Sequence, residues 1–596
     1  MSQPLPGPRR IAATALSLAL LSVLATPARA ADAACIRPDG SSDPAANTDA
    51  GNENGRDNTT CSTTASAYGI GNQAHSTGSS ALGTGNYAHG QRSSAFGNGN
   101  TAYGNDTSAF GFANSVGAVR GSAFGFGNTV GGSLGVALGS SNTSGGVAAS
   151  AVGHGSTALA DASSALGFKA HVGTDAIGAL AIGGFLDRNA DGNAALDLDS
   201  DGDGSADASS ETAAAIGASS VAVGAGVVAR AERGTALGVD STASATAASA
   251  VGYGNTASGL ESQALGSHNE ATAANASAMG RANQASANGS TAVGGLNIAS
   301  GQNSSAIGAA NTVRGVGSTG VGLGNLVEGH LAGAFGMGNT VDGEEALGVG
   351  ASNRASGYRA SAVGYGNTAS GGNSTAVGRS NTSANEASVA MGFHNSVNND
   401  FASAVGRDNT AEGIESTALG NANLAGGAIS AAVGTANGAY ADRGSAMGYG
   451  NRANSADSSA VGHSNSTDGT YGTAMGYRNQ ASGEYATAFG AYGTASGRGS
   501  LALSAFHAGE PMPYDLDLDG DGVGDASSQG ANAIGSGAMA IGTSVMAGAS
   551  GAIVVGADSR ANAEQALVFG RDATADGFRS VALGYYVSTA DSYYTA

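Results

Sequence analysis

A tetrapeptide of the form Ser-Ala-x-Gly recurs along this chain at a step of fourteen residues. It occupies residues 80–83, 94–97, 108–111 and 122–125, and the spacing continues through residues 445–448 and 459–462 to Val-Ala-Leu-Gly at 581–584. A unit of fourteen residues cannot bury a core by itself, so such units are stable only when they stack on their neighbours. The repeat therefore predicts a solenoid and excludes a set of compact globular domains.

Each unit contains two short strand-like segments, and both end near a glycine. Successive side chains of a strand point to opposite faces, so Ala95 is expected inside the coil and Phe96 outside it. We expect that only alanine fits so narrow an interior. Glycine and asparagine at the corners are expected to supply the positive φ of a sharp bend. The 101 glycines and the absence of tryptophan agree with thin coils.

The residue that follows this alanine is large and apolar in most units. Stacked coils turn these residues into one apolar stripe, which is untenable as an exposed surface of a soluble monomer. We therefore predict self-association along the stripe. Three copies around an axis satisfy this burial, and so does a face between two copies. The predicted seam consists of Leu82, Phe96, Phe110, Phe124, Val251, Leu265, Met279, Val293, Ile307, Phe335, Val377, Leu419, Met447 and Phe489.

The repeated Ser-Ala-x-Gly, with Gly-x-x-Asn-x-Ala-x-Gly between copies, resembles the head domain of YadA-like trimeric autotransporter adhesins over residues 62–590. The resemblance implies an all-β fold, a left-handed parallel β-roll of fourteen-residue coils. It also implies a homotrimer displayed on the outer membrane of a Gram-negative bacterium, where it attaches to host extracellular matrix, host-cell surface molecules or other bacteria and contributes to virulence.

Members of that family continue from the head into a neck, a coiled-coil stalk and a β-barrel anchor. After Gly584 this sequence contains neither heptads nor a run of amphipathic strands. We therefore expect a released head, a part of a longer chain, or a head that another protein anchors.

The first thirty residues have the features of a secretory signal peptide, with Arg9 and Arg10, an apolar stretch over residues 11–24 and Ala-Arg-Ala at 28–30. No later segment approaches the run of about 20 apolar residues that a membrane helix needs. The N-terminal segment 31–61 holds the two cysteines, Cys35 and Cys61. In an oxidising compartment we expect them to form a disulfide, and two free thiols are the alternative.

Two acidic inserts interrupt the fourteen-residue phase, which is predicted over residues 62–183, 214–504 and 532–590 before a tail at 591–596. The inserts, 184–213 and 505–531, share a run of alternating aspartates with glycine turns, an arrangement that suits the six to eight oxygen ligands of Ca²⁺. A solvated acidic loop is the alternative. The runs resemble the first half of EF-hand-like and thrombospondin-type calcium loops, but Ser210 and Ser528 stand where the twelfth-position glutamate would be, which predicts weak affinity or a different geometry. The predicted calcium ligands are Asp197, Asp199, Asp201, Asp203, Asp207, Asp515, Asp517, Asp519, Asp521 and Asp525.

The net charge of −21 disfavours nucleic acid and anionic lipid as partners and favours protein, sugar or a cation. The Gly-x-Ser-x-Gly at residues 131–135 lies inside the repeat phase, so we interpret it as a coil corner and expect no enzyme activity. His75, His89, His154 and His330 lack metal-ligand spacing and are expected at the surface. The alternatives to an adhesin are a secreted structural or ice-binding solenoid and a carbohydrate-active enzyme on a β-solenoid.

Overall fold

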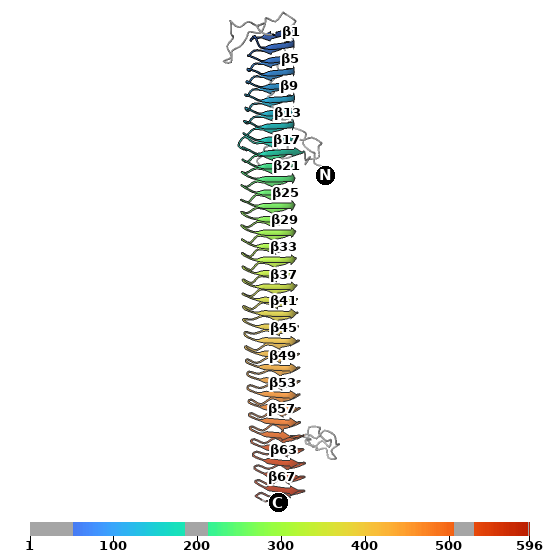
Figure 1. Ribbon diagram of the computed structural model, residues 1–596. Coiled ribbons are helices and arrows are strands. Elements are labelled where there is room, and N and C mark those ends of the chain that lie inside the picture. Colours follow the sequence, from blue (N-terminus) through green and yellow to red (C-terminus); the bar gives the residue numbers. More distant parts are fainter. Residues whose placement is uncertain (1–51, 185–211, 506–529, 594, 596) are drawn as a thin grey trace, which may run out of the picture. The chain divides into compact units, whose positions relative to one another are not determined.

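A computed structural model describes residues 52–184, 212–505, 530–593 and 595. The chain divides into two compact units, Met1–Phe185 and Leu186–Ala596, and each is a stack of β-coils (Figure 1). Within the described ranges every regular element is a strand, and no helix there could cross a membrane. The predicted signal peptide, Cys35 and the ten predicted calcium ligands lie outside the described residues.

In the first unit each coil contributes one strand of five residues and one of two. The long strands repeat every fourteen residues from β1 (Asn52–Arg56) to β17 (Ser164–Phe168), and β19 (Leu180–Gly184) follows. The short strands repeat at the same step from β2 (Thr59–Thr60) to β18 (His171–Val172). The solenoid thus begins at Asn52, one coil before the start predicted at residue 62, because the segment 52–60 pairs in register with the next coil without a Ser-Ala-x-Gly of its own.

The second unit repeats the same coil. Its long strands run from β21 (Val221–Ala225) to β59 (Thr487–Ala491) and its short strands from β20 (Ala214–Ala215) to β60 (Thr494–Ala495), all at fourteen-residue intervals. The remaining strands are β61 (Leu501–Ser504), β62 (Ala531–Ala533), β63 (Met539–Thr543), β64 (Val545–Ala547), β65 (Ile553–Ala557), β66 (Arg560–Ala561), β67 (Leu567–Arg571), β68 (Thr574–Ala575), β69 (Val581–Tyr585) and β70 (Ser588–Thr589).

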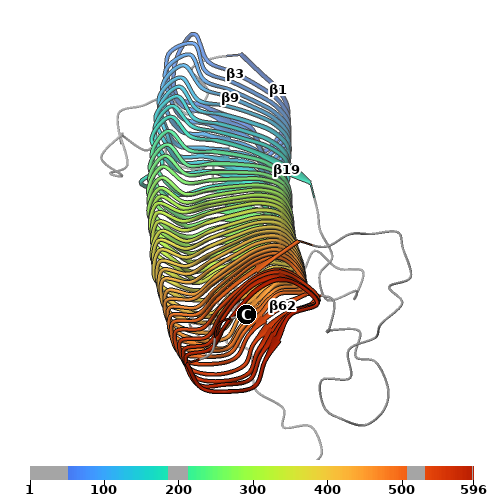
Figure 2. The same cartoon turned by 90° about the horizontal axis from the view of Figure 1, so that it is seen from below.

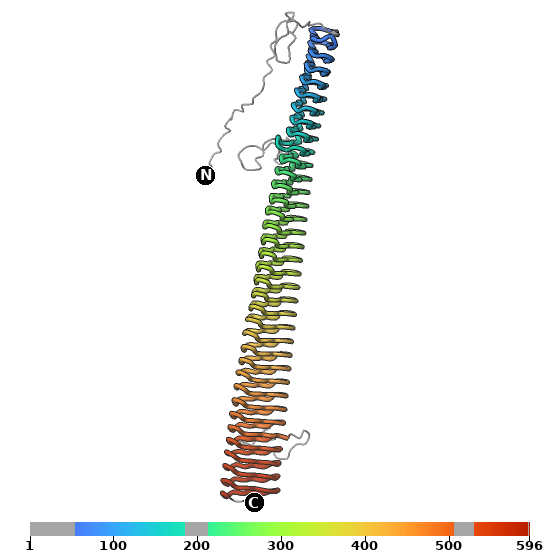
Figure 3. The backbone as a smooth tube through the Cα atoms, turned by 60° about the vertical axis from the view of Figure 1, so that its left-hand side comes forward, coloured from blue at the N-terminus to red at the C-terminus, as the bar shows by residue number. Residues whose placement is uncertain are grey.

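All neighbouring strands pair in parallel, long with long and short with short. In the pair β7 (Ser94–Asn98) and β9 (Ser108–Phe112), Ala95 lies opposite Ala109, one repeat further along. The register survives the second insert, since Ala502 of β61 pairs with Ala540 of β63. Figures 2 and 3 show, within each unit, that successive coils lie directly over one another. The predicted parallel β-solenoid with a fourteen-residue coil is confirmed.

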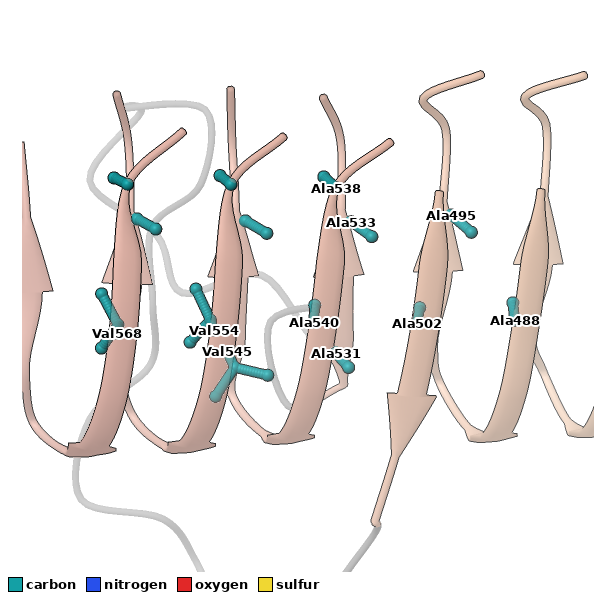
Figure 4. Close-up of a cluster of buried hydrophobic side chains, with 14 of the residues drawn as sticks. Ala488, Ala495, Ala502, Ala531, Ala533, Ala538, Ala540, Val545, Val554 and Val568 are labelled. Carbon is teal, nitrogen blue, oxygen red and sulfur yellow. The ribbon is translucent and has the colours of Figure 1, made fainter. Parts of the chain in front are cut away.

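Alanine dominates the interior, but it is not the only residue there. Ala488 and Ala502 of the long strands and Ala495 of a short strand are fully buried between the two strands of their coils (Figure 4). Towards the C-terminus Val554 and Val568 occupy the equivalent positions and are also fully buried. The expectation that only alanine fits was therefore wrong.

Valine fits inside the coil where a neighbouring side chain is removed. Val313 is fully buried on a short strand, and the residue facing it on the next long strand is Gly320 instead of alanine. A Cβ at Gly320 would lie 2.8 Å from a methyl carbon of Val313, which is too close for two carbon atoms. The same exchange recurs at Val341 and Gly348. In these two coils large and small interior residues therefore compensate each other, whereas Val397 is buried among alanines without such an exchange.

A ladder of asparagines runs along the interior beside the alanines. In the second unit it is unbroken from Asn255 to Asn479, one residue per coil, and each of these side chains is buried. The Nδ2 group of Asn86 shows the pattern in the first unit: it donates to Oδ1 of Asn72 at 3.1 Å and to the carbonyls of Leu82 and Gly97 at 2.9 and 2.8 Å. From Asn255 to Asn479 every coil is therefore hydrogen-bonded to the next through a buried side chain as well as through its backbone, whereas Val227 and Gly493 take this position in other coils.

Asparagine has the predicted positive φ at some corners, such as Asn275, Asn303 and Asn373 with φ 56°, 55° and 53°, but the ladder asparagines do not have it. Positive φ falls on the residue before each ladder asparagine, such as Gly85 with φ 62° before Asn86, and non-glycine residues such as Ser380 with φ 57° also adopt it. The glycine of Ser-Ala-x-Gly has a stricter reason. Gly378 has φ 120°, and a Cβ there would overlap the carbonyl oxygen of Gly392 in the next coil. Only glycine permits both the conformation and the close approach of the coils.

Candidate oligomerisation surface

The predicted seam residues lie on the outer face of the long strands, as side-chain alternation requires. Leu82 keeps 44% of its surface exposed, Phe335 41% and Met447 42%, whereas Ala81, the alanine before Leu82, keeps 1%. None of the fourteen predicted seam residues is buried within the chain. Their apolar side chains are therefore available to a partner.

Neighbouring coils align these side chains into a column. The rings of Phe96 and Phe110 stack with centroids 4.8 Å apart, and those of Phe110 and Phe124 with centroids 5.1 Å apart. A shallow hollow of about 350 Å³ lies on the same column, lined by Tyr68, Leu82 and Phe96 with two serines and an alanine. The stripe is thus an apolar surface with shallow hollows.

The face that carries the stripe contains no charge. We call the first and third residues of each long strand the seam face, because both point outward on either side of the buried alanine. At these positions every described coil of both units has an uncharged residue. The charged residues are confined to other surfaces of the coil. An apolar face without charges has the composition of an interface core.

Charged residues gather on the two edges of the coil. We call the last residue of each long strand and the residue after it the first edge, and the four residues after each short strand the second edge. Several ion pairs on the second edge join successive coils: Arg92 and Asp106, Arg443 and Asp457 (both at 2.5 Å), and Arg359 and Glu345 at 2.6 Å. The guanidinium of Arg92 holds the pKa of Asp106 below its usual value.

On the first edge of the second unit, aromatic and arginine side chains alternate over four coils. The guanidinium of Arg379 lies 5.7 Å from the ring centroid of Tyr365 and 5.6 Å from that of Phe393, and Arg407 lies 5.8 Å from Phe393. Arg407 also pairs with Asp408 at 2.9 Å. Contacts of a cation with a ring face at these distances are attractive. The edge is therefore an ordered cationic and aromatic ridge.

Two of the histidines expected at the surface are buried instead. His75 and His89 keep 6% and 5% exposure, because they pack against tyrosines of adjacent coils on the short-strand side. The ring of His89 lies 4.5 Å from that of Tyr103, and the ring of His75 lies 4.9 Å from that of Tyr87. Sequence spacing did not reveal this cluster, since aromatic residues occupy the same column only once coils are stacked.

The other predicted features have the following places. The Gly-x-Ser-x-Gly at 131–135 lies in the turn between β12 (Thr129–Val130) and β13 (Val136–Ser140), at a coil corner. Within the described ranges no three histidine, cysteine or acidic side chains converge on a point where they could hold a metal ion. Cys61 is disulfide-bonded, and its pairing with Cys35 stays a prediction because Cys35 lies outside these ranges.

One protein-family comparison bears on this architecture. The family model described as "YadA head domain repeat (2 copies)" matches thirteen times, at residues 88–114, 144–170, 229–255, 271–296, 299–324, 342–367, 355–381, 369–395, 398–423, 453–479, 468–492, 481–503 and 561–586. No curated protein matches the chain.

The matched segments fall in both compact units and follow the coils. YadA-like head domains belong to surface-exposed adhesins of Gram-negative bacteria and typically form trimers, which indicates an exported, adhesin-like surface protein. Adhesins with this β-solenoid are typically not enzymes. The solenoid of this chain is a YadA-like head domain.

Proposed function

We propose that this protein is the head of a homotrimeric adhesin that attaches the bacterial surface to host extracellular matrix, host cells or other bacteria. The observation that carries the proposal is the seam face: a column of large apolar side chains along each unit, without a charge in any described coil. The family supplies the number of copies, since its heads typically form trimers.

The energetics favour association along this face. Leu419 and Met447 keep 44% and 42% of their surface exposed in the single chain. Complete burial of such a side chain is worth about 1.5–3 kcal/mol, so covering the exposed part contributes about 1 kcal/mol for each coil. Association costs on the order of 4–15 kcal/mol. A face that extends over dozens of coils therefore exceeds this cost, and the trimer is expected to be stable.

The mass of the exported chain in solution tests the trimer. Light scattering after gel filtration is expected to give three times the chain mass. Replacement of Leu419 and Met447 together by aspartate should shift the mass towards that of the monomer, because each trimer would bury six charges. Thr410→Asp, on the outer side of a short strand, is the matched control and should leave the trimer intact. A monomeric wild-type chain would refute the proposal.

The repetitive outer surface supports attachment. Equivalent sites repeated along the solenoid and on three chains allow many weak contacts to act together, which raises the overall affinity without a deep pocket. Binding of the purified trimer to matrix-coated surfaces and cultured cells is expected, and it should fall sharply for the monomeric Leu419 and Met447 variant. Equal binding by monomer and trimer would argue against multivalent attachment.

We also propose that the two acidic inserts bind Ca²⁺, on the basis of their sequence. Titration of the exported chain with Ca²⁺ in a calorimeter should give heat at up to millimolar concentration. Asp199→Asn and Asp517→Asn should each remove the signal of one insert. An absence of heat would identify the inserts as acidic loops without a specific metal.

A further inference from the structure

The two edges of the coil carry opposite charges in the part of the second unit that spans residues 361–415. The first edge has Arg379, Arg407 and a single carboxylate, Asp408, which pairs with Arg407. The second edge of the same coils has four carboxylates in three successive turns: Glu386, Asp400, Glu412 and Glu415. The seam face, without charge, lies between these edges. On these coils positive charge therefore lies on one side of the seam face and negative charge on the other.

The cationic edge is only partly neutralised within the chain. Among the described residues no carboxylate lies within ion-pair distance of Arg379, which contacts Tyr365 and Phe393 instead. Arg407 shares Asp408 with His394, whose Nδ1 lies 2.8 Å from that carboxylate. At least one guanidinium on this edge is thus oriented by aromatic rings and exposed to solvent without an anionic partner.

The carboxylates on the second edge of these coils also lack cationic partners among the described residues. In the described part of the chain, Glu386, Asp400, Glu412 and Glu415 make no ion pair, although other acidic residues of the second edge do. Glu386 accepts a hydrogen bond from the side chain of Asn373 at 2.7 Å, which leaves its charge uncompensated. Coils are separated by about 4.8 Å, so these carboxylates repel one another. A cation from outside the chain would relieve this repulsion.

Symmetry decides which edges meet when copies pack through the seam face. In a ring whose axis is parallel to the solenoid, the first edge of each chain faces the second edge of the next, and every coil stays level with its own copies. In an antiparallel pair with a twofold axis perpendicular to the solenoid, like edges face each other. The observed charges are therefore complementary in the parallel ring and repulsive in the antiparallel pair.

The residues that become level in a parallel ring match in chemistry. Arg379 and Glu386 belong to the same coil, as do Arg407 and Glu412. In the coil between them, Phe393 on the first edge and Phe401 on the second keep 40% and 59% of their surface exposed. In a parallel ring, Arg379 therefore lies level with Glu386 of the neighbouring copy, Phe393 with Phe401, and Arg407 with Glu412.

We propose that, in the homotrimer, the first edge of each chain over these coils binds the second edge of the next, with Arg379 facing Glu386 and Phe393 facing Phe401 of the neighbouring copy. The inference rests on the proposed self-association through the seam face, and it adds the residues in contact. The partner is a second copy of this chain in parallel orientation.

Cysteine cross-linking tests this geometry directly. In the full exported chain, Arg379→Cys combined with Glu386→Cys is expected to give covalent dimers and trimers under mild oxidation. The two residues lie on opposite edges of one coil, so a bond within one chain is not expected. Each single variant should remain monomeric on a non-reducing gel, because the parallel ring separates identical edges. The native cysteines are common to all three variants and are controlled by the singles.

The possible outcomes distinguish the edge contact from the trimer itself. Covalent dimers from the single Arg379→Cys variant would show that like edges meet, which overturns the parallel arrangement. A trimeric mass without cross-linking of the double variant would overturn the edge contact and leave the proposed trimer intact. A monomeric mass of the wild-type chain would overturn both.

Charge reversal provides an independent measurement. Arg379→Glu should weaken the trimer by about tenfold or more, because three equivalent surface pairs change at once. Adding Glu386→Arg should restore it. Arg281→Glu is the matched control: Arg281 occupies the same position on the first edge, but the second edge of its coil, residues 286–289, has no charged residue. An equal effect of both reversals, or a failure of the double reversal to restore the trimer, would refute the pairing.

Discussion

Removing one rung of the asparagine ladder should open the solenoid locally. Asn367 is fully buried, and its Nδ2 donates to Oδ1 of Asn353 at 3.0 Å and to the carbonyls of Val363 and Gly378 at 2.9 and 2.8 Å. Its Oδ1 accepts from the backbone N–H and the Nδ2 of Asn381 at 3.0 and 2.9 Å. The two hydrogens of the Asn367 Nδ2 are shared among its three acceptors. Asn367→Ala removes all of these contacts and leaves the buried N–H of Asn381 without an acceptor.

The magnitude follows from these contacts. A net contribution of about 1 kcal/mol for a hydrogen bond, with about 1–3 kcal/mol for a buried group left unsatisfied, predicts a loss of roughly 3–6 kcal/mol. Each coil contacts only its neighbours, so the loss appears as local opening of the coils around residue 367. Amide exchange there should accelerate by about two to four orders of magnitude, since about 1.4 kcal/mol corresponds to a factor of ten.

Hydrogen exchange measured by mass spectrometry checks this prediction, and two variants sharpen it. Asn367→Ser should lose much less, because Ser241 occupies this ladder position naturally, donating to Gly252 O and accepting from the N–H of Asn255, both at 3.3 Å. Asn421→Ala, at an exposed position on the first edge, should have no effect. Unchanged exchange around residue 367 in the alanine variant would refute the view that the ladder holds the coils together.

Three further predictions concern the packing and its pH dependence. Gly378→Ala should prevent correct stacking, whereas Gly366→Ala, at φ 63° where a Cβ would meet only the Ser380 hydroxyl at 3.8 Å, should cost about 1 kcal/mol, which thermal denaturation distinguishes. Gly320→Ala should destabilise the chain and Val313→Ala should rescue it, so a cycle without coupling would contradict the exchange of volume between these two positions. Burial lowers the pKa of His171, so the unfolded chain binds its proton more tightly and the free energy of unfolding should fall as the pH drops below about 6.5. His171→Gln should remove that component.

Several features could be predicted from the sequence because they depend only on local geometry. The step of fourteen residues, the parallel solenoid, the inward alanine and the outward stripe all follow from the alternation of side chains along a strand and from the repeat itself. Leu82 and Met447 could be placed on the outside because their orientation depends only on the strand that contains them. The family resemblance followed from the same periodic residues.

The tertiary structure decided what depends on contacts between coils. The role of Asn86, the burial of His75 and the exchange of volume between Val313 and Gly320 involve partners that are distant in sequence and adjacent only after stacking. A regularly spaced asparagine in most coils was the available signal for the ladder, but a corner residue would give the same periodicity. The opposite charges of Arg379 and Glu386 likewise acquire meaning only when the fold assigns them to opposite edges of one coil. Periodicity alone therefore determines the coil, and the packing of one coil on the next determines which of its residues hold it together.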